Sequence, residues 1–152
     1  MPVEALLSDD EDARAILTAA ARAADALRAG RDAVVFTSRQ VISGVDARES
    51  LLIGQRISEG LVRILRGLKV RPRYLVAKGG ITSSDLATRG LNVRRAMVMG
   101  QILPGVPVWR TGPESRFPEL PYVIFPGNVG GPQALAELVT ALRTQPEGSQ
   151  TC

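Results

Sequence analysis

The sequence predicts a single α/β domain, a three-layer sandwich with a mostly parallel sheet and helices on both faces. Short apolar runs of strand type alternate with longer stretches of helical periodicity along the 152 residues, and this alternation is typical of βαβ units. Glycine-rich turns directly follow two of the apolar runs. The composition, 45% hydrophobic and 22% charged, is that of a globular protein with one core.

Helical periodicity marks four segments. They are residues 9–29, 47–68, 84–90 and 132–143. The first is rich in alanine and stops at Gly30, a favourable residue after a helix. The second is long and amphipathic, and Asp46 with Glu49 three residues later indicates where it begins. We expect the short third helix to be capped through Thr82 and Asp85.

Five apolar runs are expected to be strands. They are residues 33–37, 74–77, 96–99, 106–109 and 122–125. The first is a continuous apolar run bounded by polar residues, which suits a strand covered on both faces. Pro104-Gly105 and Pro107 interrupt the later runs, so some of these strands are expected at a sheet edge, where proline is tolerated. The residues from 144 onward are polar, and we expect residues 146–152 to form a disordered tail.

Two glycine-rich turns carry the functional signal. They are Lys78-Gly79-Gly80-Ile81-Thr82-Ser83-Ser84-Asp85 and Gly127-Asn128-Val129-Gly130-Gly131. Paired glycines let main-chain N–H groups approach a ligand, and a helix that begins just beyond adds unpaired donors and a positive dipole end. Ligands of parallel sheets bind beyond the carboxyl ends of strands, where both turns and Ser38-Arg39 are expected. Each turn could equally be a tight strand-to-helix connection without a ligand.

Several classes of function are excluded or disfavoured. The chain has no histidine and one cysteine, Cys152, which excludes imidazole bases, internal disulfides and the usual zinc sites. Neither the Walker phosphate loop nor the dinucleotide fingerprint occurs. The net charge of +4 is spread over dispersed arginines with 4% aromatic residues, which disfavours nucleic acid as a partner. No apolar stretch approaches the length of a membrane span and no secretion signal is evident, so we expect a cytoplasmic protein.

Long sequence blocks resemble the C-terminal nucleotide-binding domain of the four-carbon acid sugar kinase family. The blocks are TSR at 37–39, RPRYLVAKGGITSSD at 71–85, GQILPGVPVW at 100–109 and FPGNVG at 125–130. The resemblance implies an ATP-dependent kinase that acts on threonate, erythronate or keto relatives, with ATP/ADP and Mg²⁺ as cofactors. It implies that the two turns hold the nucleotide through Gly79, Gly80, Ile81, Thr82, Ser83, Gly127, Asn128 and Gly130. Ser38, Arg39 and Lys78 are candidate phosphate contacts, and no catalytic or metal-binding residue is assigned.

The chain departs from the pattern of that family in two respects. We expect residues 1–145 to form a nucleotide-binding domain that lacks the first strand of the family's C-terminal domain, and the sugar-binding N-terminal domain is absent from the chain. We therefore expect little kinase activity from the chain alone and a separate sugar-binding domain or subunit as a partner. A domain that lacks a strand should expose an apolar patch or sheet edge, so we also expect a homo-oligomer. The alternative is a nucleotide or phosphometabolite sensor without catalysis.

Overall fold

The computed structural model describes residue 6, residues 12–38 and residues 45–144. Helices occupy α2 (Asp12–Arg28), α3 (Ala47–Gly67), α4 (Gly80–Asp85), the single π-helical turn η1 (Leu86–Gly90) and α5 (Ala134–Thr144). Strands occupy β1 (Leu75–Lys78), β2 (Ala96–Leu103), β3 (Val106–Thr111) and β4 (Pro121–Phe125). The predicted tail, residues 146–152, lies outside the described part of the chain. None of the helices in that part is both long and apolar enough to cross a membrane.

The four strands form one mixed sheet in the order β1-β4-β3-β2. Only β1 and β4 run parallel, while β2 pairs with β3 and β3 with β4 in antiparallel fashion. The α/β class is confirmed, but the mostly parallel sheet is wrong. The physical reason is the short connections, since the tight turn at Gly105 (φ +77°) joins β2 to β3 as a hairpin, whereas parallel neighbours need a crossover.

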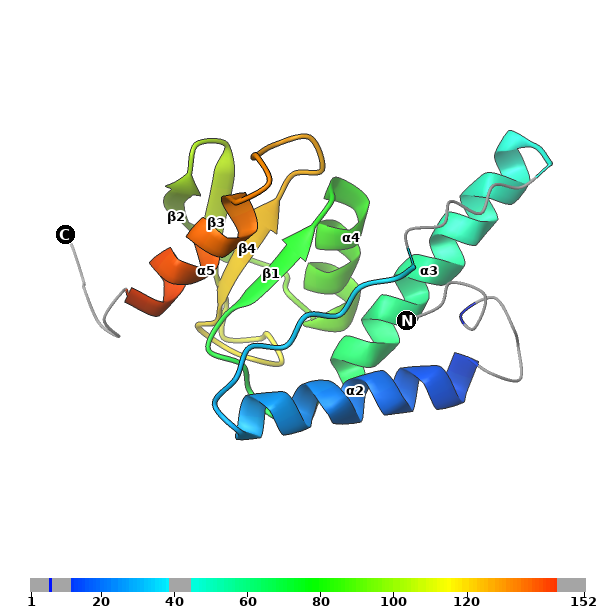
Figure 1. The fold of residues 1–152 in the computed structure, drawn as a ribbon, viewed down its shortest axis with the longest axis horizontal. Helices are drawn as coiled ribbons and strands as arrows, with labels where there is room; N and C mark the ends of the chain where they lie inside the picture. The colour runs from blue at the N-terminus through cyan, green and yellow to red at the C-terminus, as the bar shows by residue number, and fades with distance from the viewer. Residues whose placement is uncertain (1–5, 7–11, 39–44, 145–152) are drawn as a thin grey trace.

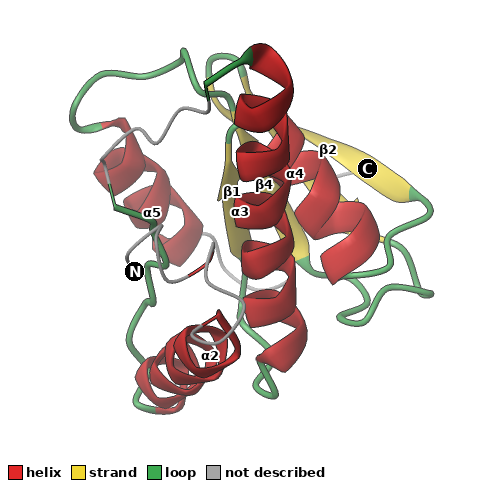
Figure 2. Ribbon diagram, turned by 90° about the vertical axis from the view of Figure 1, so that its right-hand side faces the viewer, coloured by secondary structure: helices red, strands yellow, loops and turns green. Residues whose placement is uncertain are grey.

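Core residues lie on both faces of the sheet. Alternate residues of β4 point to opposite faces, so that Tyr122 joins the core beneath α2, α3 and η1, while Val123 and Phe125 join the core beneath α5. Figure 2 shows α5 on one side of the strands and α3 and α4 on the other. This four-stranded arrangement does not establish the regular three-layer sandwich that we predicted.

The two long helices form as their sequences predict. The Asp46 side chain accepts a hydrogen bond from the Glu49 amide at 2.7 Å, and the Glu49 carboxylate accepts one from the Val45 amide at 2.6 Å, a reciprocal cap that begins α3. Small side chains of α2, including Ala20 and Ala23, are buried against the C-terminal part of α3. The N-terminal part of α3 projects from the body of the molecule (Figure 1).

The strand expected at residues 33–37 is wrong. This segment carries no ladder, and Val34 and Phe36 expose 71% and 65% of their surface. It runs from the end of α2 past β1 (Figure 1), and Asp32 at its start accepts a hydrogen bond from the Tyr74 hydroxyl at 2.7 Å. A strand needs a neighbouring strand to satisfy its backbone groups, and within the described residues β1 pairs with β4 alone.

Candidate functional site

The two glycine-rich turns lie side by side at one end of the sheet. The first follows β1 and the second follows β4, and the final residues of these parallel strands, Lys78 and Phe125, are register partners. The Gly79 amide donates to the Phe125 carbonyl at 2.8 Å. The predicted convergence of the two turns at the carboxyl ends of neighbouring strands is therefore confirmed.

The first turn leads directly into α4. Gly79 precedes the helix with φ +96°, a conformation that favours glycine, and no side chain caps the helix. The predicted cap through Thr82 and Asp85 is therefore wrong, since both residues lie inside α4 and Asp85 instead accepts a hydrogen bond from Ser58 of α3. The main-chain amides of the first helical turn, Gly80 to Thr82, have no acceptor within the helix itself. They are donors that a ligand can use.

Ser83 faces inward and shapes this turn. Its side chain is buried, and its hydroxyl lies within hydrogen-bonding distance of the Ala77 carbonyl (3.0 Å) and the Gly79 carbonyl (2.7 Å). Its amide donates to the Gly79 carbonyl at 2.9 Å. Both donor groups of Ser83, its amide and its hydroxyl, therefore bond within the protein. Its neighbours are more accessible, since Thr82 is half-buried and Ile81 is exposed.

Lys78 bridges the two strand ends. Its ammonium group donates to the Pro126 carbonyl at 3.2 Å and lies 4.3 Å from the centre of the Phe125 ring. The side chain is exposed, so its positive charge stands beside both turns and faces solvent. This position suits contact with an anion held by either turn.

The second turn is built around Gly130. This residue has φ +87°, and a Cβ atom there would lie 2.6 Å from Ala134 Cβ and 3.1 Å from the Phe125 ring. Glycine is therefore required at this position by backbone conformation and by packing. Gly127 and Asn128 are exposed on the way into the turn.

Three other glycines of the turns are not required by the fold. A Cβ atom at Gly80 or Gly127 would meet nothing within 4 Å, and neither residue has a positive φ. The same holds for Gly131. These glycines leave open space beside the first-turn amides of α4 and beside the second turn, which is the space that an approaching phosphate group needs.

Ser38-Arg39, the third segment that was predicted at the carboxyl ends of the strands, does not follow a strand in the structure. Residues 33–37 form no strand, Ser38 is half-buried and already engaged in an interaction, and Arg39 lies outside the described residues. The two candidate phosphate contacts therefore stay predictions, whereas Lys78 lies between the two turns.

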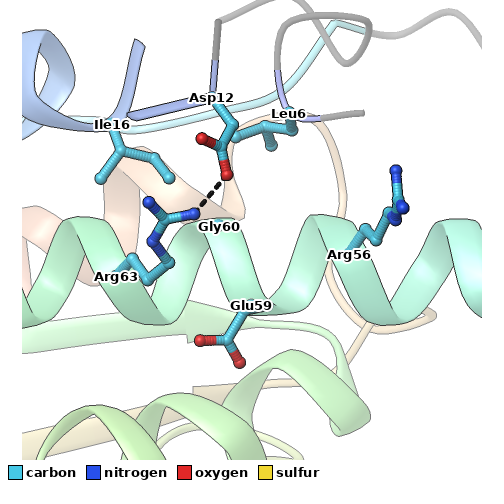
Figure 3. A pocket seen from close by; sticks show the side chains of 7 residues that line it. All are labelled: Leu6, Asp12, Ile16, Arg56, Glu59, Gly60 and Arg63. Carbon is cyan, nitrogen blue, oxygen red and sulfur yellow. Dashed lines mark hydrogen bonds and ion pairs between the residues drawn. The ribbon is translucent and has the colours of Figure 1, made fainter. Parts of the chain in front are cut away.

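A small pocket of about 120 Å³ lies elsewhere, between α2 and α3 (Figure 3). Its lining residues are Leu6, Asp12, Ile16, Arg56, Glu59, Gly60 and Arg63. Asp12 pairs with Arg63 across it, and Glu59 points away from it and pairs with Arg89. Because these charges are paired within the protein, the pocket offers little to a charged ligand and is not the candidate site.

Sequence reasoning missed two residues that hold the turns in place. Phe125 receives the Gly79 hydrogen bond and packs against Gly130. The Tyr122 hydroxyl donates to the Ser83 carbonyl at 2.6 Å, and burial raises the pKa of Tyr122 far above its ordinary range, so this donor stays protonated. Both lie in the apolar strand before the second turn, and in the sequence such residues look like ordinary core.

The fold is an α/β domain with two glycine-rich turns at the ends of neighbouring strands, the part of such folds beyond which ligands commonly bind. The chain belongs to the family described as the nucleotide-binding C-terminal domain, whose model matches residues 1–135. The resemblance to the four-carbon acid sugar kinase family is thereby confirmed. Among curated proteins, none is significantly similar to the chain.

Two solved structures share the fold. Both are crystal structures of a domain of unknown function, DUF1537, from Bordetella bronchiseptica, described as domain-swapped dimers with bound citrate. Each is 23% identical, with TM-scores of 0.58 and 0.61 over 94% and 91% of this chain. The chain spans only 32% of each of those structures.

Proposed function

We propose that this chain is the ATP-binding part of a kinase that phosphorylates four-carbon sugar acids such as threonate, erythronate or their keto relatives. The observation that carries the proposal is that Gly80 and Gly127 are glycines although neither the backbone conformation nor the packing at these positions requires glycine. They lie in two adjacent turns, and the first of these turns also carries the amides of Gly80 to Thr82, which have no acceptor within α4; this combination suits a polyphosphate. Membership of a nucleotide-binding family supports the same ligand.

In this proposal each turn has a distinct task. The amides of Gly80, Ile81 and Thr82 bind phosphate oxygens from one side, and the loop of Gly127 and Asn128 binds from the other. Lys78 neutralises phosphate charge between them. Gly79, Ser83 and Gly130 give the turns their shape. Phosphoryl transfer mainly requires such positioning and charge neutralisation.

We propose that Mg²⁺ arrives with the nucleotide. No group of three or more metal-binding side chains occurs among the described residues. Mg²⁺ in kinases commonly keeps several waters and takes substrate phosphates as ligands, so a dedicated protein cage is not required. When bound with the nucleotide, the magnesium ion would neutralise part of the phosphate charge.

We further propose that the acceptor site is supplied by a separate sugar-binding domain or subunit, and that the chain works in the cytoplasm, where ATP is available. The chain spans 32% of each related structure, which leaves room in such proteins for an acceptor domain.

Self-association is also part of the proposal, because the related structures are described as domain-swapped dimers and this chain exposes apolar side chains such as Val34.

Two calorimetric titrations test the nucleotide site, one with ADP and one with ATP in the presence of Mg²⁺. We expect the wild-type chain to bind, and we expect Gly80→Ala or Gly127→Ala to weaken binding by about tenfold or more, because each methyl group fills space needed by phosphate. Neither change should lower the unfolding midpoint. Gly54→Ala is the matched control, since Gly54 is exposed in α3 and also has nothing within 4 Å of its would-be Cβ.

Failure of the wild-type chain to bind any nucleotide at millimolar concentration would refute the proposal. Equal weakening by Gly54→Ala would refute the assigned position. With ATP and a sugar acid, we expect no product from the chain alone and product once a sugar-binding partner is added. Tight binding of a phosphometabolite in preference to ATP would instead favour the sensor.

A further inference from the structure

We propose that Tyr122 is a positioning residue for the nucleotide site, one that holds α4, and with it the first glycine-rich turn, against β4. This inference rests on the proposed function. Tyr122 lies on β4, three residues before the strand ends at Phe125, and its hydroxyl reaches the carbonyl of Ser83 in α4 at 2.6 Å. A single hydrogen bond thus joins the strand of the second turn to the helix of the first.

The bond is buried and its geometry is fixed by packing. Tyr122 is 1% exposed and sits in the core with Ala77, Ala87 and Leu91. Its ring lies 6.5 Å from that of Trp109. A ring held on all sides in this way gives its hydroxyl little freedom to choose another partner.

The Ser83 carbonyl does not need Tyr122 to be satisfied. It already accepts a hydrogen bond from the Leu86 amide at the end of α4, which also donates to the Thr82 carbonyl. The second bond, from Tyr122, therefore adds direction to α4 rather than repairing a buried unpaired group. This distinguishes positioning from the ordinary pairing of a buried polar atom.

Two further donors act on the same turn. The Ser83 hydroxyl lies near the carbonyls of Ala77 and Gly79, and the Gly79 amide donates to Phe125. Residues 79–83 are thus tied to β1 and to β4 at once. Donors that are held in place before binding lose little freedom when the ligand arrives, so a loosened turn should bind the same nucleotide more weakly.

The test compares ADP binding by Tyr122→Phe with binding by two control variants, at a temperature where all are folded. Tyr74→Phe makes the same change at the chain's other tyrosine. Tyr74 lies just before β1, and its hydroxyl donates to the Asp32 carboxylate. Thr111→Val removes another buried hydroxyl, which bonds the Phe117 carbonyl at 2.7 Å in the loop after β3. We expect the Kd for ADP to rise about three- to tenfold in Tyr122→Phe and to stay unchanged in both controls.

Hydrogen exchange supplies a readout without nucleotide. In Tyr122→Phe the amides of Ser83 and Leu86, which are hydrogen-bonded in the first turn and α4, should exchange several-fold faster than in wild type, while those of α3 stay unchanged. Equal ADP affinity of Tyr122→Phe and wild type would overturn the role of Tyr122 alone. Equal weakening by Thr111→Val would overturn it too, because stability alone would then explain the effect. A wild-type chain that binds no nucleotide would overturn the proposed function and this role together.

Discussion

At the scale of single residues, Glu114 organises the loop between β3 and β4. Its carboxylate accepts hydrogen bonds from the amides of Arg95 at 2.9 Å and Arg94 at 3.1 Å, and it pairs with the Arg95 side chain at 3.4 Å. A hydrogen bond from its own amide is the largest cause that holds its pKa below the ordinary value of 4.5; desolvation opposes this shift, and the Arg95 and Arg94 amides add to it. The folded chain therefore favours the charged form.

This shift predicts a pH-dependent effect of Glu114→Gln. Because the pKa is lower in the folded chain than in the unfolded one, the charge contributes stability at every pH above about 4.5, and the contribution is lost as the pH falls through the folded value. Urea unfolding of wild type and variant should differ at pH 7 and converge towards pH 3. A difference that stays constant over this range would contradict the prediction.

At the scale of elements, Arg116 closes the C-terminal end of α3. Its guanidinium group donates to the Leu65 carbonyl at 2.6 Å and to the Leu68 carbonyl, and burial lowers its pKa. The Leu65 carbonyl also accepts a hydrogen bond from the Leu68 amide at 3.1 Å, so Arg116 adds a charged donor there, and a cation interacts favourably with the C-terminal end of the helix dipole. One side chain from a loop near β4 thus fixes the end of a helix that lies far away in the sequence.

Replacing Arg116 tests this contact. Arg116→Ala should lower the free energy of unfolding by about 1–3 kcal/mol, because two buried carbonyls lose charged donors. Arg116→Lys should recover only part of that loss, since a single ammonium group cannot reproduce the two-pronged contact. Thermal unfolding measures both. Equal midpoints for Arg116→Ala and wild type would contradict the assignment.

Local signals predicted most elements, and non-local pairing explains the failures. The amphipathic stripe and the cap at Asp46 suffice for α3, because both depend on residues within one turn. Residues 33–37 carry a typical strand sequence, yet strand formation depends on a partner that the sequence of the segment does not reveal. The parallel or antiparallel direction of β3 likewise depends on its connections rather than on its own residues.

The candidate site shows the same division. The glycine turns were predictable, because Gly79 and its neighbours directly follow an apolar run. The inward orientation of Ser83 was not, since the residue type alone allows either a ligand contact or a bond to the Ala77 carbonyl. Only the packed structure distinguishes Gly130, which the fold requires, from Gly80, which it does not.

At the scale of the whole molecule, exposed apolar side chains predict self-association. Val34 and Phe36 are 71% and 65% exposed in an extended segment, and surfaces of this kind favour contact with another chain. Val34→Lys should shift the assembly towards monomer in light scattering, because a charge there opposes burial. Leu17→Lys is the matched control, because Leu17 is 68% exposed on the outer face of α2. A monomeric wild-type chain would contradict the prediction.

The pairing of β1 with β4 has a consequence for how the protein folds. Leu75 pairs with Tyr122 across the entire β2–β3 hairpin, so this ladder closes a long loop, whereas the hairpin closes a short one. Closing long loops is slow relative to local pairing. The two turns are brought together by this ladder, so a partly folded chain that lacks it cannot present both turns to a ligand.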